Sequence, residues 1–146
     1  MNRQKVFEKI VDHLLAQKHP AFEGGSCMYR TPEGEKCAVG ALIPDELYDI
    51  KFEKKSIATL LDSREDWFYP LVEALDLPVN DQKEWKLDID LLASMQDFHD
   101  HFIFRGGQTP ATFSVDDPEF TQRLRNIVAR EHLGIRLAER WEIPDK

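Results

Sequence analysis

Three long stretches of this sequence repeat their apolar residues at the three- and four-residue spacing of an α-helix. They are residues 3–18, 91–103 and 119–133, and helical periodicity places each apolar set on one face. The expected buried faces are Val6, Phe7, Ile10, Val11, Leu14 and Leu15, then Leu91, Leu92, Met95, Phe98, Phe102 and Ile103, and finally Phe120, Leu124, Ile127 and Val128. We therefore expect helices packed around one core, in a single domain that spans residues 1–146.

Shorter helices are expected at about 56–62, 67–75 and 136–141, with a helical turn beginning at Pro44. Ser63 fits the pattern of a cap for the 67–75 helix, and Asp90 fits a cap for the 91–103 helix. Gly134 is the expected C-terminal cap of the 119–133 helix. Turns or loops are expected at 24–25, 77–81 and 105–110, where Gly, Pro and Asn gather.

The stretch from Ser26 to Tyr48 reads SCMYRTPEGEKCAVGALIPDELY and contains both cysteines. Pro32 followed by Gly34 is typical of a turn, so we expect a short β-hairpin within residues 27–39. It would bring Cys27 and Cys37 near each other. The small apolar residues at 38–43 favour a short buried helix directly afterwards. The expected fold class is mainly α, a small α+β bundle with one hairpin.

The composition is that of a globular protein, with 42% hydrophobic and 32% charged residues. No apolar run approaches the ~18 residues that span a bilayer, and the first residues interleave charges with apolar side chains, unlike a signal peptide. We therefore expect a cytoplasmic protein without membrane association. In a reducing cytosol a permanent Cys27–Cys37 disulfide is not expected.

The net charge of −8 is concentrated in one part of the chain. Residues 76–119 carry ten acidic and three basic residues, which accounts for −7 of it. This counts against a nucleic-acid-binding face, which needs clustered Lys and Arg, but permits a basic protein partner or mimicry of a phosphate backbone. The simpler interpretation is an acidic surface that keeps the protein soluble. The candidate binding residues in and beside this region are Trp67, Tyr69, Trp85, Asp88, Asp90 and Asp97, although most aromatic side chains in such a domain are buried.

We favour the interpretation that Cys37 is a buried, inert thiol among small apolar residues, and that His99 is a core histidine. The alternative is that Cys37 is a nucleophile. If the residues after it are helical, the positive end of that helix favours the thiolate, and His99 with Gln96 or Asp100 could supply a base and its orienting group. A zinc site at Cys27, Cys37 and His99 does not match the usual short cysteine spacing, and the segment from Arg105 to Gly107 lacks the context of a phosphate loop. No metal or cofactor is expected.

Three pieces of the sequence resemble an uncharacterised family of short bacterial and phage proteins. The family combines HLLxQ, CxYRxxxGxKCAVGxLIPDExY and LQxxHD, which match residues 13–17, 27–48 and 95–100 here, with Met95 in place of the leucine. The resemblance covers about the first hundred residues. It implies a module found in phages and bacterial genomes, and it brings no activity or substrate with it.

The leading hypothesis is a non-catalytic binding or regulatory protein, associated with phages or mobile elements, that acts on a protein partner through its acidic region. One alternative is a cysteine-dependent hydrolase or transferase that uses Cys37 and His99. Another is a small-ligand sponge, for example for a nucleotide, with a pocket between the hairpin and the 91–103 helix.

Overall fold

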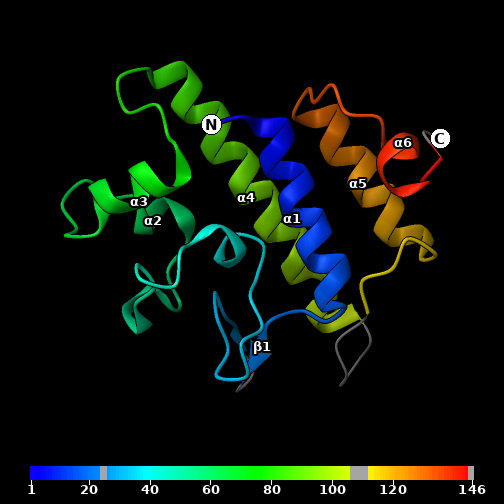
Figure 1. The fold of residues 1–146 in the computed structure, drawn as a ribbon, viewed down its shortest axis with the longest axis horizontal. Coiled ribbons are helices and arrows are strands. Elements are labelled where there is room, and N and C mark those ends of the chain that lie inside the picture. Colours follow the sequence, from blue (N-terminus) through cyan, green and yellow to red (C-terminus); the bar gives the residue numbers. More distant parts are fainter. Residues whose placement is uncertain (24–25, 106–111, 145–146) are drawn as a thin grey trace.

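The computed structural model describes residues 1–23, 26–105 and 112–144. The predicted turn at Gly24 and Gly25 and the predicted loop after Arg105 lie outside these residues. The expected fold class is confirmed: the chain is mainly helical, with one two-stranded antiparallel sheet (Figure 1).

The three long periodic stretches form the three longest helices, which lie side by side in Figure 1. They are α1 (Arg3–Gln17), α4 (Gln82–Arg105) and α5 (Pro118–Arg130). Asn2 caps α1 by accepting from the N–H of Lys5, and Asp117 caps α5 by accepting from the N–H of Glu119. The short α6 (Leu137–Trp141) follows α5, as expected.

α4 separates two groups of buried side chains. One face of α4, with Leu91, Met95, Phe98 and Phe102, packs with α1, α5 and α6. Leu92 points to the second group, which is built from residues 21–77 and includes Phe52, Leu60 and Leu71. The predicted apolar stripe of this helix is therefore confirmed, but it serves two sides of the molecule.

The second side is assembled from short elements. They are β1 (Phe22–Glu23), β2 (Ser26–Cys27), the 3₁₀ turns η1 (Gly40–Leu42) and η2 (Ile50–Phe52), α2 (Ile57–Leu60) and α3 (Phe68–Leu75). Ser56 caps α2 by accepting from the N–H of Thr59, so the helix predicted at 56–62 is confirmed in a shorter form. The helical turn predicted from Pro44 forms, since the carbonyl of Pro44 accepts from the N–H groups of Leu47 and Tyr48, but it does not continue into a helix.

The hairpin expected within residues 27–39 is present but minimal, and the regular pairing lies just before it. Regular pairing joins Phe22 to Cys27, whereas residues 28–39 contribute a single antiparallel bridge between Arg30 and Lys36. The turn itself is where Pro32 and Gly34 predict it, and Gly34 adopts a φ of 93° that a side chain would disfavour. Cys27 therefore pairs across the sheet with Phe22 and not with Cys37, and both thiols are free.

Three predicted helix ends are wrong. α4 begins about two turns earlier than expected, where Asp81 accepts from the N–H of Glu84, so Asp90 is an interior residue that pairs with Lys86. Trp67, and not Ser63, occupies the cap position of α3, without a side-chain cap. α5 ends at Arg130 with Glu131 as its C-cap, and the left-handed residue that follows is His132 and not Gly134.

Candidate functional site

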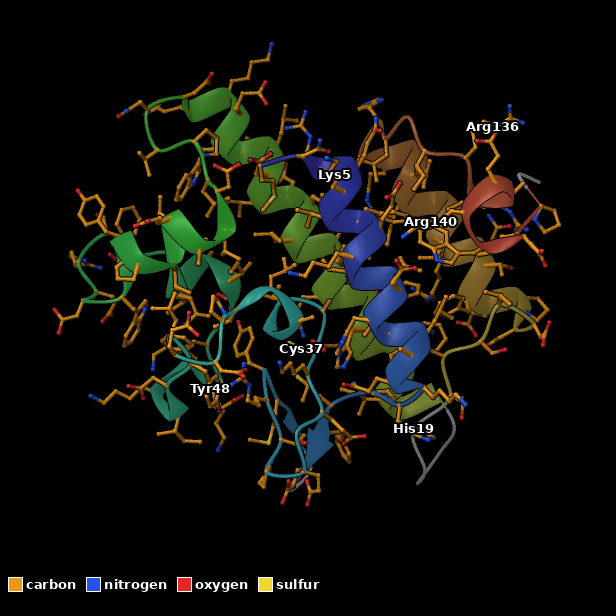
Figure 2. The ribbon with its side chains drawn as sticks, in the orientation of Figure 1. Lys5, His19, Cys37, Tyr48, Arg136 and Arg140 are labelled. Atoms are coloured by element: carbon orange, nitrogen blue, oxygen red, sulfur yellow. The ribbon has the colours of Figure 1, made fainter. Side chains whose placement is uncertain are left out.

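Cys37 lies in the interior, just before η1 (Figure 2). Its side chain is fully buried, and the N–H of Gly40 donates a hydrogen bond to its Sγ at 3.2 Å. Burial raises the pKa of the thiol far above its ordinary value, because a thiolate would lose its hydration; the N–H groups of Gly40 and Val39 act in the opposite direction but more weakly. Cys37 is therefore a packed thiol and not an activated nucleophile.

His99 on α4 is fully buried, and both of its ring nitrogens have partners. The N–H of Ala21 donates to Nε2 at 2.9 Å, and because an amide N–H can only donate, Nε2 carries no proton. The neutral ring then holds its proton on Nδ1, which donates to Oδ1 of Asp100 at 2.8 Å. Neither nitrogen remains free to take a proton from a thiol.

Gln96 completes a chain of hydrogen bonds that we call the polar relay. Its Oε1 accepts from the N–H of Val39 at 3.2 Å, and its Nε2 donates to Oδ1 of Asp100 at 2.8 Å. The polar relay consists of Gln96, His99 and Asp100, with the backbone N–H groups of Ala21 and Val39 at its ends. It attaches the segments on both sides of the hairpin to α4, which is a structural role.

Two further polar residues with this role escaped the sequence-based prediction of sites. On α1, His13 donates from Nε2 to the carbonyl of Lys36 at 3.0 Å, and Gln17 both donates to that carbonyl and accepts from the N–H of Lys36. Burial lowers the pKa of His13 and so favours its neutral form. The signal in the sequence is their spacing of four residues, which places both side chains on one edge of the helix.

Gln96, His99 and Asp100, which were proposed for catalysis, therefore lie together, but their hydrogen-bonding groups are paired in a way that supports the fold. Gln96 and His99 form hydrogen bonds with Asp100 and with the backbone N–H groups of Val39 and Ala21. A cysteine-dependent hydrolase or transferase needs an accessible thiolate and a free base, and this arrangement offers neither.

A cleft of about 310 Å³ opens beside the polar relay, between the hairpin and α4. Its walls include Cys27 and Tyr29 from one side, Ile57 from the start of α2, and Gln96, Asp97 and Asp100 from α4. The pKa of Cys27 is raised to about 11, first by partial desolvation of its sulfur and then by the negative charge of Asp100. A pocket between the hairpin and the helix, as the small-ligand hypothesis expects, is therefore present.

The predicted aromatic residues divide into two environments. Trp67 is half-buried, donates from Nε1 to the carbonyl of Leu60 at 2.7 Å and packs against Phe52, so it is part of the scaffold. Tyr69 is 73% exposed, and its ring lies edge-on to Phe68. Trp85 is half-buried beside Phe68 and lines a second cleft of about 300 Å³ with Leu61 and Val79.

The predicted acidic residues are not equivalent either. Asp88 is only 1% exposed and binds the amino group of Met1 at 3.1 Å and Arg3 at 2.9 Å, so it is unavailable to a partner. Asp90 is half-buried and paired with Lys86. Asp97 is exposed at the edge of the 310 Å³ cleft.

Within residues 1–23, 26–105 and 112–144, no three His, Cys, Asp or Glu side chains come together as a metal site. None of the helices in these ranges has the length and apolar character needed to cross a membrane.

Comparisons of the chain with protein-family models, with curated proteins and with solved structures found no match. The resemblance to short bacterial and phage proteins therefore stays a prediction.

Proposed function

We propose that this chain is a non-catalytic binding protein that recognises a basic segment of a protein partner. The observation that carries this proposal is a surface on which the exposed Tyr69 and Val79 and the half-buried Trp85 lie over the buried side chains of Leu61 and Phe68. We call these five residues the aromatic face. Tyr69 is 73% exposed and Val79 is 43% exposed, and a cleft of about 300 Å³ lies between Phe68, Val79 and Trp85. A large apolar side chain of a partner could enter this cleft.

The aromatic face occupies one side of the molecule. α3, the loop after it and the start of α4 lie together, and they are on the opposite side from α5 and α6 (Figure 1). Exposed aromatic side chains beside an apolar depression are typical of protein-recognition surfaces, because they supply contact area with little loss of side-chain entropy.

The charges around the aromatic face define the chemistry of the partner. Glu73 on α3 and Asp81 at the start of α4 are exposed, and among the described residues neither has an ion pair with a cation. Of the cations on the neighbouring segments, Arg64 pairs with Asp62 and Lys86 pairs with Asp90, whereas Lys83 is exposed and has no ion pair among the described residues. The two carboxylates of Glu73 and Asp81 outnumber the single ammonium group of Lys83, and this excess of negative charge favours Lys or Arg on the partner, next to its apolar anchor.

Synthetic peptides test this proposal directly. One set alternates Lys or Arg with Leu or Phe, and a matched set carries Glu in place of the basic residues. We expect the basic set to bind and to change the fluorescence of Trp85, more strongly at low than at high salt, because salt screens the exposed charges. Equal binding of both sets, or no binding by either, would contradict the proposal.

The chain offers closely matched controls for the site. Tyr69→Ser and Val79→Ser should each weaken peptide binding at least fivefold. Ile50→Ser and Val115→Ser alter residues of similar exposure, 69% and 38%, that lie outside the aromatic face, and they should leave binding unchanged. If the control variants weaken binding as much as the test variants, the surface is misassigned.

A further inference from the structure

The cleft of about 310 Å³ beside the polar relay is separate from the aromatic face and has its own chemistry. It lies between the hairpin, residues 54–57 and α4, whereas the aromatic face lies around α3 and the start of α4. Its volume is at the lower end for small-molecule sites, which restricts an occupant to a compact molecule.

The polar relay holds the carboxylate of Asp100 in a fixed orientation at this cleft. Oδ1 of Asp100 accepts from both Gln96 and His99, each at 2.8 Å, and His99 is in turn fixed by the N–H of Ala21. In a catalytic dyad the carboxylate orients the imidazole toward a substrate. Here the imidazole is buried and orients the carboxylate, and Asp100 is the member of the pair that lines the cleft.

A second carboxylate lies one helical turn away. Asp97 lines the same cleft, is exposed and has no ion pair with any cation in the described part of the chain. Lys54 and Lys55 also contribute to the lining, but the ammonium group of Lys55 is bound to the carbonyl of Lys51 and lies over the ring of Trp67. Among the described residues that line the cleft, the two carboxylates are therefore those of Asp97 and Asp100, and Lys54 is the lysine without a hydrogen bond or ion pair. Asp97 also borders a cleft toward α5 that contains Arg123 and Arg130, but these arginines pair with Glu119 and Glu131.

The remaining walls are largely apolar. Ile57 and Ala93 line the cleft, and the hydroxyl of Tyr29 is turned to the carbonyl of Lys55, which leaves its ring as a wall. A fixed carboxylate beside apolar walls suits a molecule with one cationic end and a short apolar body, because the charge is held by hydrogen bonds while the body is removed from water.

We propose that this cleft binds a small organic cation, a primary amine or guanidine with a short apolar body, whose charged group lies between Asp97 and Asp100. The same carboxylates would repel a phosphate group, so a nucleotide is the disfavoured occupant.

Calorimetric titration and thermal unfolding of the full chain test the proposal with butylamine, agmatine and butylguanidine as probes. Butanoate and adenosine monophosphate serve as the anionic comparisons. We expect the cations to bind and to raise the melting temperature, and the anions to do neither. Absence of binding by every cation, or binding of the anions alone, would overturn the proposal.

Variants locate the site. Asp97→Asn and Asp100→Asn should each weaken cation binding at least tenfold, whereas Asp116→Asn, an exposed aspartate outside the cleft, should not change it. Asp100→Asn also disturbs the polar relay and could prevent folding. In that case, cation binding by Asp97→Asn is the deciding measurement. If Asp97→Asn binds the cations as the unchanged chain does, the charged group is not held where we place it. The peptide experiment on the aromatic face is independent of this outcome.

Discussion

The residues of the polar relay, and Tyr69 and Trp85 of the aromatic face, were candidates for function in the sequence, but the two regions have opposite environments in the structure. In the polar relay, Gln96 and His99 use their hydrogen-bonding groups on the backbone and on Asp100. On the aromatic face, Tyr69 is exposed, and the carboxylates around it lack cationic partners among the described residues. A side chain that could perform chemistry contributes to binding only if the fold leaves one of its groups unused.

The largest expected effect is at Gly40, next to Val39 at one end of the polar relay, where the packing leaves no room for a side chain. A Cβ at Gly40 would lie 2.0 Å from the carbonyl oxygen of Tyr29, and backbone cannot move aside cheaply. We expect Gly40→Ala to lower the free energy of unfolding by about 3 kcal/mol or more, measured by urea denaturation. Gly34→Ala is the control: nothing surrounds that position, so only its left-handed φ should matter, at about 1 kcal/mol. Similar costs for the two variants would show that Tyr29 does not approach Gly40 this closely.

Removing the imidazole of the polar relay should cost somewhat less. His99→Leu keeps most of the volume but leaves the N–H of Ala21 without an acceptor, and we expect a loss of about 2 kcal/mol in urea denaturation. His101→Leu, two residues along the same helix, removes a partly exposed contact with Glu119 and should cost at most about 0.5 kcal/mol. A reversal of this order would mean that His99 is not the structural histidine.

Thiol labelling separates buried from accessible groups in the same region. With Cys27→Ala, iodoacetamide should leave Cys37 unmodified until the protein is denatured, because its sulfur is fully buried. With Cys37→Ala, Cys27 should react, but on the order of a hundredfold more slowly at pH 8 than a free cysteine. A pKa raised to about 11 leaves little thiolate below that pH, so the rate should climb as the pH rises toward it. Rapid labelling of Cys37 in the folded protein would revive the enzyme hypothesis.

On the aromatic face the expected effect on stability is smallest. Tyr69→Ser should change the free energy of unfolding by less than about 0.5 kcal/mol, because the ring is already exposed to water. Leu92→Ala, at a fully buried position, is the reference and should cost about 2–5 kcal/mol in the same urea titration. A large loss for Tyr69→Ser would mean that the ring supports the fold and is not reserved for a partner.

Helices were predictable wherever the apolar residues kept a helical spacing over a long stretch, as in α1, α4 and α5. The residues at which these helices begin and end were harder to predict. Asp81 and Asp90 are both good helix-capping residues, and local preference cannot choose between them. The choice depends on contacts distant in sequence: the turns of α4 between Asp81 and Asp90 include Asp88, which binds Arg3, 85 residues away in the chain.

The candidate site shows the same division. The motif residues Gln96, His99 and Asp100 could be selected from the sequence, but not their roles, because the role of His99 depends on a single amide, that of Ala21, 78 residues earlier. His13 and Gln17 were missed as site residues because their partner is the backbone of Lys36, and a backbone group leaves no mark in the sequence.

The amino-acid sequence by itself determined the helical framework, the turn at Pro32–Gly34 and the excess of negative charge, since each depends on local spacing or simple counting. Only the tertiary structure decided that Cys37 is enclosed, that Asp88 is ion-paired with Arg3, and that Asp97 and Asp100 line a cleft while Tyr69 is exposed. The physical reason is that contacts between segments far apart in the chain determine which side chains are buried and which polar groups find a hydrogen-bond partner. The same contacts therefore determine which polar groups remain without one.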